Sequence, residues 1–175
     1  MSIQLRFVPH TNDELVMGHC YWWPLIDVDA ISCTHNPNGF SPMLAVIRSL
    51  GRDMGYFTHP KLTAMHSGKF LVISHAYEVR PVVITSSRTA EWDTESHAAA
   101  EIIQVADVER SRSLCMTHFS FLPGRFPTRA FEQCVRSAKL ASHHTSITRI
   151  TIDVDARCQV QAERVLDDVR RARAT

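Results

Sequence analysis

The sequence predicts an α+β fold with a mostly antiparallel sheet. Three observations support this prediction. One helix with a broad apolar stripe follows an aromatic segment, several stretches rich in β-branched residues come after it, and two more helical patterns flank the last strand-like stretch. The 175 residues are enough to bury a single core, so we expect one domain over residues 1–175.

The first part of the chain contains two candidate strands and the principal helix. Residues 3–8 form a short candidate strand, and the aromatic run 14–26 forms a second, with a proline that favours an edge or a bend. A helix is predicted over 41–55, because a Ser-Pro step starts it and a glycine ends it. Its apolar positions, which include Met43 and Ile47, cover too wide a part of the helix surface for a helix with one solvent-exposed face. We expect this helix to be largely buried.

Strand patterns dominate the middle of the chain. The range 70–92 carries Val, Ile, Tyr and Thr in partial alternation, and Pro81 indicates a bend between two strands. Residues 101–110 fit a strand or a helix, and the alanines just before them favour the helix. Alternation predicts another strand over 112–122.

The last third predicts a helix, a strand and a second helix. Residues 128–142 place Phe131 and other apolar side chains on one face, and Thr128 is the expected cap. The range 146–156 is the clearest strand pattern in the chain. The sequence from 159 to 172 predicts an amphipathic helix with four apolar positions, Val160, Val165, Leu166 and Val169.

Charge and composition exclude several classes of protein. Nineteen basic and eighteen acidic residues leave a formal charge of +1, and the basic cluster at Arg170, Arg171 and Arg173 falls in the last helical turn, where it complements the helix dipole. We therefore expect no nucleic-acid partner. The six glycines form no phosphate-binding loop, so no cofactor is expected either.

The cysteines and the apolar runs indicate a compartment. Five cysteines, odd in number and without a CxxC pair, argue against a disulfide framework and suit reducing conditions. The N-terminus has no long apolar core of a secretory signal. No uncharged apolar run approaches the ~20 residues that span a bilayer. A cytoplasmic protein without a membrane span is the resulting expectation.

Two acids at spacing two, Asp27 and Asp29, stand between the aromatic run and the principal helix, followed by a loop rich in Asn, Pro and Gly. They have two interpretations. Both can cap the loop by accepting backbone hydrogen bonds. Alternatively, a carboxylate near a helix N-terminus can act as a base or a nucleophile. The structural interpretation is favoured for Asp27, and both stay open for Asp29.

Several motifs together resemble a known family. The D-x-D motif at 26–30 is followed by Asn and Pro at 36–38, by a Tyr/Arg-Pro-Val stretch at 77–82, and by a final strand with a short tail at 150–161. Their order is similar to that of the hot-dog fold, in particular thioesterases of the 4-hydroxybenzoyl-CoA type. The resemblance implies an antiparallel sheet wrapped around a long buried helix, with 123–145 as an insertion.

The resemblance also implies a reaction. Asp29 matches the acid that serves as base or nucleophile in hydrolysis of an acyl thioester, carried by coenzyme A or an acyl carrier protein. Backbone N–H groups around Asn38, Gly39 and Phe40 would hold the carbonyl oxygen. His35 would orient the substrate or assist proton transfer.

The acyl group would then lie along the buried helix, among Trp22, Trp23, Met43 and Ile47. Folds of this kind pair their sheets edge to edge, so the resemblance implies a homodimer or homotetramer with sites at the subunit interface.

Two other functions stay open. The Ser32-Cys33 pair stands where the family usually has Gly-His, which favours a non-hydrolytic hot-dog protein that is dehydratase-like, cyclase-like or acyl-binding. Alternatively, Trp22, Trp23 and the helix over 128–142 form the partner surface of a non-enzymatic assembly protein.

Two further chemistries are disfavoured. His19, Cys20, Cys33 and His35 match no standard zinc spacing, so no metal is expected. Cys33 near a helix N-terminus would be a candidate nucleophile, but no base partner is visible in the sequence.

Overall fold

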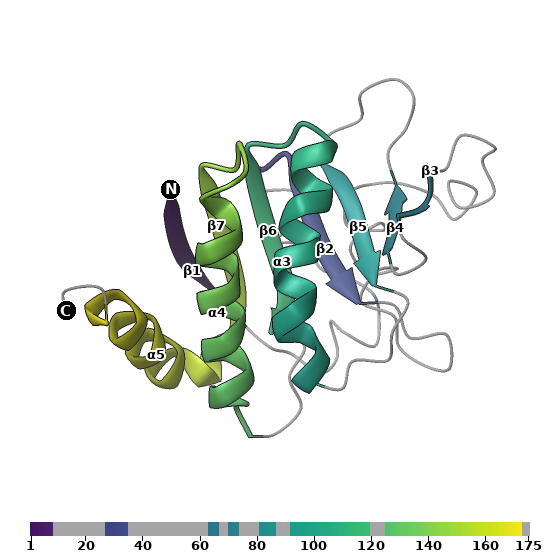
Figure 1. Cartoon of the computed structure of the whole chain (residues 1–175). Coiled ribbons are helices and arrows are strands. Elements are labelled where there is room, and N and C mark those ends of the chain that lie inside the picture. The colour runs from purple at the N-terminus through teal and green to yellow at the C-terminus, as the bar shows by residue number, and fades with distance from the viewer. Residues whose placement is uncertain are drawn as a thin grey trace.

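The computed structural model describes residues 1–8, 27–34, 63–66, 70–73, 81–86, 92–119 and 125–172. These residues form one seven-stranded sheet with helices packed against it (Figure 1). The strands are β1 (Ser2–Val8), β2 (Ala30–Thr34), β3 (Thr63–His66), β4 (Phe70–Ile73), β5 (Val82–Ser86), β6 (Ser113–Phe119) and β7 (Arg149–Asp155). The helices are α3 (Trp92–Val108), α4 (Thr128–Ser142) and α5 (Gln159–Arg171), and a 3-10 turn, η3 (Ala156–Cys158), precedes α5.

The sheet is mostly parallel, so the predicted hot-dog fold with its antiparallel sheet around a long buried helix is wrong. The strand order is β1-β7-β6-β2-β5-β4-β3, and the first five strands in this order run parallel. Only β4 and β3 pair in antiparallel fashion. The helices α3 and α4 explain why the strands run parallel. Each connects the end of one strand to the start of the next strand in the chain, so the chain returns across the sheet as a helix and not as an antiparallel strand.

Burial on both faces explains why the alternation of apolar residues misled the sequence prediction. All seven residues of β6 are buried, and so are Ile31, Ser32 and Cys33 in the neighbouring strand β2. A parallel strand covered on both sides has no wet face. The alternation that predicts β6 therefore does not distinguish a half-buried antiparallel strand from a fully buried parallel one.

The helix α4 confirms the predicted helix over 128–142 and packs into the core. Phe131 is fully buried, and its ring meets Phe119 edge-on, with 4.9 Å between centroids, and Phe126 at 5.1 Å. The predicted cap is wrong, because Pro127 occupies the N-cap position and no side chain caps the helix. Since α4 connects β6 to β7 and lies beside α3 in Figure 1, it is a crossover helix within the sheet topology. The interpretation of 123–145 as an insertion assumed an antiparallel hot-dog sheet, and the sheet is mostly parallel.

The other predicted elements in the described ranges agree closely with the structure. The strand predictions at 3–8 and 146–156 correspond to β1 and β7, and the two strands around Pro81 correspond to β4 and β5. The range 101–110 falls largely in α3, as the helical alternative expected. The prediction of a C-terminal helix is confirmed by α5, except that Val160 is 75% exposed.

An ion pair joins the two strands β1 and β7. Arg6 donates through Nε to one carboxylate oxygen of Asp153 at 2.7 Å and through its Nη2 to the other. The side chain of Asp153 is fully buried, while that of Arg6 is 27% exposed. The two residues are directly paired in the register of the strands. A strand from the start of the chain is thereby fixed to one near its end.

The outer side of β1 is the edge of the sheet, and an arginine partly closes it. Arg170 on α5 donates from Nη2 to the carbonyl oxygen of Ile3 at 3.2 Å. Ser2 faces the other way, toward β7, where its N–H donates to Thr148. An edge strand with open backbone groups is a template for unwanted pairing, and a charged side chain over it reduces that risk.

The end of α3 is tied to the segment before β7. Asp107 accepts hydrogen bonds from the hydroxyl and the backbone N–H of Ser146. Both hydrogen bonds lower the pKa of Asp107, and the bond from the Ser146 hydroxyl has the larger effect.

Within the described residues, no helix has the length and apolar character needed to cross a membrane. The predicted strand at 14–26 and the predicted helix at 41–55 lie outside the described residues.

Candidate functional site

The parallel strands β1, β2, β5, β6 and β7 all end at one side of the sheet, which we call the carboxyl edge. In Figure 1 the arrowheads of β2 and β5 mark this edge at the bottom. The opposite side, where these strands begin, is the amino edge. In open α/β sheets, ligands bind outside the carboxyl ends of the strands. A ligand site is therefore expected at the carboxyl edge.

The chain changes direction between β2 and β6, which are neighbours in the sheet. After β2 the chain continues to β3, β4 and β5 on one side of the pair, and after β6 it continues to β7 on the other side. In open α/β sheets a ligand is expected at such a reversal, outside the carboxyl ends of the two strands. The geometry thus indicates a ligand site above β2 and β6.

Helix N-termini also gather at this edge. Each of α3, α4 and α5 follows a strand that ends there, and Figure 1 shows α3 and α4 starting at the same side as the arrowheads. Neither α4 nor α5 has a side-chain cap or an acidic residue in its first turn. Unpaired N–H groups and the helix dipole favour an anion at such positions. The first turns of α4 and α5 are therefore electrostatically suited to a negatively charged ligand.

Two arginines strengthen this field at the start of α4. Arg125 precedes the helix, Arg129 lies in its first turn, and both are exposed. A cation at a helix N-terminus is opposed by the dipole. The arrangement becomes favourable when an anion lies between the arginines and the helix. By contrast, Arg157 near α5 is occupied with buried Asp155, and their hydrogen bond raises the pKa of Arg157.

Polar side chains lie where β2 and β6 approach this edge. Thr117 donates from Oγ1 to the carbonyl oxygen of Ser32 at 2.8 Å, and His118 Nε2 lies 3.1 Å from Ser32 Oγ. All three residues are buried. Their hydrogen bonds join β2 and β6 close to the carboxyl edge. They form a support for the site and are not its exposed surface.

Cys33 lies inside β2 and not at a helix N-terminus. It is fully buried, and its Sγ lies 3.9 Å from the carbonyl oxygen of Ile84. Thiols buried away from solvent are poor nucleophiles. The placement therefore does not fit the nucleophile considered from the sequence.

Asp29 lies at the amino edge, opposite the carboxyl ends of β2 and β6. Its Oδ2 accepts from the backbone N–H groups of Arg112 at 2.8 Å and Ser113 at 3.1 Å, and from the Ser113 hydroxyl at 3.1 Å. The carboxylate joins the start of β2 to the start of β6, so these donors lie 83 and 84 residues away in the chain and not in the loop that the structural interpretation had Asp29 cap. Asp27 is exposed, and its carbonyl oxygen accepts from the guanidinium of Arg149.

The remaining site residues predicted from the sequence lie outside the described residues. These are Trp22, Trp23, His35, Asn38, Gly39, Phe40, Met43 and Ile47, together with His19 and Cys20 of the metal alternative. Within the described ranges, no group of three or more His, Cys, Asp or Glu side chains is placed to hold a metal.

The sequence analysis missed Arg125 and Arg129. Arg125 lies within the Pro- and Gly-containing break at 123–127, and Arg129 follows this break by two residues. The available signal was electrostatic. A helix whose first turn has an arginine, no acid and no capping side chain is unusual unless an anion compensates it. This signal indicates a ligand site only when the helix follows a parallel strand, because its N-terminus then lies at the carboxyl edge of the sheet.

No protein-family model matches the sequence, and the comparison with curated proteins gives no match. Solved structures of a macrodomain from Oceanobacillus iheyensis do resemble the chain. A mutant of that macrodomain with ADPR gives a TM-score of 0.51 at 11% identity, covering 82% of this chain and 87% of that one. The same macrodomain with ADP gives 0.51 at 11% identity, covering 82% and 85%. At this identity the likeness shows the fold, which is the α/β fold of macrodomains.

This finding corrects the function predicted from the sequence. The thioesterase, its acyl-CoA or acyl carrier protein partner and the non-hydrolytic hot-dog alternative all rested on an antiparallel sheet around a helix, and the sheet is parallel. The homodimer or homotetramer was inferred from pairing of hot-dog sheets and loses its basis for the same reason.

Proposed function

We propose that this chain binds a nucleoside diphosphate of the ADP-ribose class outside the carboxyl ends of β2 and β6. The observation that carries the proposal is the reversal of chain direction between these two adjacent strands. The likeness to macrodomain structures whose names include ADPR and ADP supports this ligand class.

The charge at the starts of α4 and α5 matches a diphosphate. The first turns of α4 and α5 contain no carboxylate that would repel it, and Arg125 and Arg129 supply two positive charges next to α4. Guanidinium groups bind phosphate oxygens through paired hydrogen bonds. A helix N-terminus adds about 0.3–1 kcal/mol for an exposed anion. Neither contribution is large alone, so the two act together on the diphosphate.

The proposal is tested by isothermal titration calorimetry with ADP-ribose, ADP and adenosine. We expect ADP-ribose and ADP to bind and adenosine to bind at least about tenfold more weakly, because it lacks the diphosphate that the charges recognise. Folded protein that binds none of the three contradicts the proposal. Chromatography of an ADP-ribosylated peptide after incubation reads out hydrolysis of the ADP-ribosyl bond in the same samples.

Two variants locate the site. Arg129→Gln should weaken ADP-ribose binding by about three- to tenfold, since a charge-assisted hydrogen bond is lost. The matched control is Arg136→Gln on the same helix, where Arg136 is exposed and pairs with Glu132 at 2.8 Å. The control should bind as the unchanged protein does. Equal effects of both substitutions would remove α4 from the proposed site.

A further inference from the structure

A second surface is indicated by the outer edge of β1, which is the last strand on its side of the sheet. The N–H of Ser2 donates to the carbonyl oxygen of Thr148 at 2.9 Å, so the backbone groups of Ser2 point toward β7. Backbone groups alternate in direction along a strand in a parallel ladder. Those of Ile3, Leu5 and Phe7 therefore point outward, away from β7.

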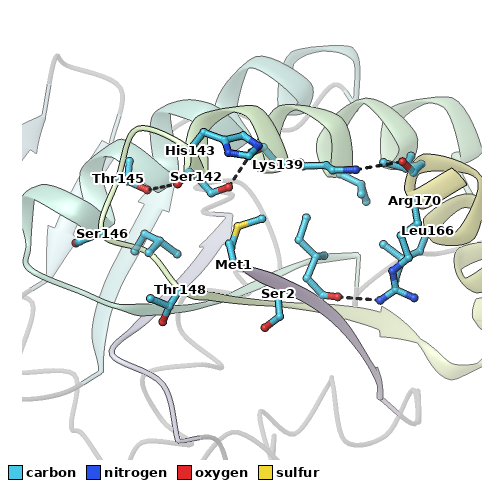
Figure 2. Close-up of a pocket in the computed structure, with 14 residues that line it drawn as sticks. Met1, Ser2, Lys139, Ser142, His143, Thr145, Ser146, Thr148, Leu166 and Arg170 are labelled. Carbon is cyan, nitrogen blue, oxygen red and sulfur yellow. Dashed lines mark hydrogen bonds between the residues drawn. The ribbon is translucent and has the colours of Figure 1, made fainter. Parts of the chain in front are cut away.

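Arg170 occupies one end of this outer edge. Figure 2 shows its guanidinium extending from α5 to β1, where Nη2 donates to the carbonyl oxygen of Ile3 at 3.2 Å. Within the described residues, the N–H and C=O groups of Leu5 and Phe7 have no hydrogen-bond partner. A row of such groups is a template for an added strand. Two residues of the edge thus present two donors and two acceptors.

A groove between β1 and α5 runs beside these backbone groups. Its volume is about 520 Å³, and Leu5 and Phe7 line it from β1. Both side chains are only partly buried, so apolar surface stays accessible at the edge. Leu166 lines the groove from α5. An apolar side chain placed there would be removed from water, which is favourable. The edge therefore offers backbone hydrogen bonds and apolar contact in one place.

The negative charge of the groove comes from α5. Glu163 and Asp167 line the groove, and the one cation among its described lining residues is Arg170. Arg170 lies 3.4 Å from Asp167 and also binds Ile3, so it is occupied. Glu163 is exposed, and its described partner is the neutral amide of Gln159 at 2.9 Å. No described cation therefore compensates the charge of Glu163.

Glu163 lies at the level of the outward-pointing groups. Because α5 begins at the carboxyl edge and ends at the amino edge, it runs opposite to β1. Arg170 marks the level of Ile3, and Glu163 lies about 10 Å farther along the helix axis. Leu5 and Phe7 lie about 7 and 13 Å beyond Ile3 along the strand. A cationic side chain on a strand added at these two residues would meet Glu163.

Protection of the edge is the simpler interpretation, since a charged side chain over an edge strand discourages pairing. Arg170 fits this interpretation at one end. The only cation of β1 itself is Arg6, which binds the buried carboxylate of Asp153. At Leu5 and Phe7 the nearby charge is the uncompensated acid on α5. An acid there disfavours acidic segments and attracts basic ones, which is selection of a partner and not general protection.

We propose that the edge of β1 at Leu5 and Phe7 binds an extended segment of a partner protein as an additional strand. Residues two apart on such a strand project to the same face. One of them is apolar and lies on Leu5 and Phe7, and the other is Lys or Arg and faces Glu163. Main-chain hydrogen bonds supply affinity, and the two side chains supply specificity. Since β7 and β6 lie between β1 and β2, this surface is separate from the nucleotide site.

The probe is the peptide acetyl-Thr-Thr-Val-Thr-Lys-Thr-Thr-amide, in which Val and Lys are two apart. Titration followed by two-dimensional NMR should detect binding. At saturation the amide protons of Leu5 and Phe7 should exchange with solvent at least about fivefold more slowly. The amides of Gln4 and Arg6 are internal controls, because they point toward β7, and should change less than about twofold. Absence of binding, or equal protection of all four amides, overturns the proposal.

Two changes of the peptide separate backbone from side-chain contacts. N-methylation of alternate amides, prepared in both registers, keeps the side chains and removes the donors that face β1 in one of the two products. That product should bind at least about tenfold more weakly. Replacing the peptide's Lys by Glu should weaken binding about two- to fivefold or more. Equal affinity of all N-methylated peptides contradicts strand addition, and equal affinity of the Lys and Glu peptides contradicts recognition of charge.

Exchange of charge tests Glu163 directly. Glu163→Lys should weaken binding of the Lys peptide about two- to fivefold, and the Glu peptide should bind this variant within about twofold of the original pair. Asp168→Lys is the matched control, because Asp168 is exposed on the same helix, pairs with Arg171 and does not line the groove. The control should bind both peptides as the unchanged protein does. Equal effects of the two substitutions would remove Glu163 from the surface.

A second copy of this chain is the competing occupant of the edge. Sedimentation of the protein without peptide, at the concentration used for NMR, should give a monomer. A dimer that dissociates when the Lys peptide is added would assign the edge of β1 to self-association and overturn the proposal.

Discussion

At the scale of single residues, the carboxylate of Asp29 holds two strand starts together. It accepts two backbone N–H groups and one hydroxyl from Arg112 and Ser113. Replacing Asp29 with Ala removes the acceptor of all three hydrogen bonds and should cost about 1–3 kcal/mol of the free energy of unfolding. Asp27→Ala is the control, because the Asp27 side chain is exposed, and should change stability by less than about 0.5 kcal/mol. Urea denaturation measures both, and equal losses would contradict the structural role of Asp29.

The ion pair of Arg6 and Asp153 allows a second prediction at this scale. Arg6→Met leaves a fully buried carboxylate without its partner, which should cost about 3–5 kcal/mol. Arg136→Met breaks an exposed pair on α4 and should cost about 0.3–0.5 kcal/mol. The double variant Arg6→Met with Asp153→Leu should regain most of the loss, because no charge is then buried. The prediction fails if Arg6→Met is as mild as Arg136→Met in urea denaturation.

The sequence left the role of Asp29 open between a structural and a catalytic interpretation. The D-x-D spacing identified Asp29 as special, but its partners are more than eighty residues away in the chain. A contact of that range is created by the topology, and no local pattern encodes it. Arg129 was missed for the related reason that a helix N-terminus becomes part of a site only when strands bring it to one edge.

At the scale of secondary-structure elements, α4 is a core helix, and this gives a third prediction. Phe131 lies between Phe119 and Phe126 and is fully buried. Phe131→Ala should cost about 3–5 kcal/mol, through lost burial and the cavity left behind. Leu140→Ala on the same helix should stay within about 0.5 kcal/mol, because Leu140 is 69% exposed. Thermal or urea unfolding distinguishes them, and similar small effects would place α4 outside the core.

The elements themselves were largely predictable, and their directions were not. Local periodicity gave the bounds of α4 and, within a few residues, those of β1, β7 and α5. Whether two strands run parallel depends on what connects them. Because 101–110 fitted both a strand and a helix, the connection between β5 and β6 was undecided, and an antiparallel sheet remained consistent with the pattern. The helix over 128–142 was predicted but was assigned to an insertion, so neither of the two crossover helices was used to set strand direction.

At the scale of the whole molecule, the two edges of the sheet have separate roles. Asp29 belongs to the amino edge, while the reversal between β2 and β6 and the first turns of the helices belong to the carboxyl edge. Short motifs such as D-x-D and R-P-V are shared by unrelated folds. Their order along the chain resembled a hot-dog protein, but order does not determine strand direction. The strand order and direction determine the fold and the expected location of a ligand.

This separation of the edges leads to the last prediction, in which stability and ligand response change independently. A ligand at 100 times its dissociation constant stabilises the folded chain by about 2.7 kcal/mol. For a chain of this size each kcal/mol raises Tm by about 2–4 °C, so ADP-ribose should raise it by about 5–11 °C. Asp29→Ala should lower Tm and keep this increase. Arg129→Glu should raise Tm slightly, since an acid suits a helix N-terminus, and lose most of the increase.

Thermal denaturation followed by circular dichroism measures Tm with and without ADP-ribose for the unchanged protein and for both variants. Arg136→Glu is the control for reversal of charge on α4, and it should keep the full increase in Tm because Arg136 lies in the middle of the helix. A stable Asp29→Ala protein that no longer responds to ADP-ribose would place the ligand at the amino edge. An Arg129→Glu protein that responds fully would remove the arginine from the site. Opposite signs of the two effects in Arg129→Glu are the strongest test, because a general loss of folding cannot raise Tm and abolish binding together.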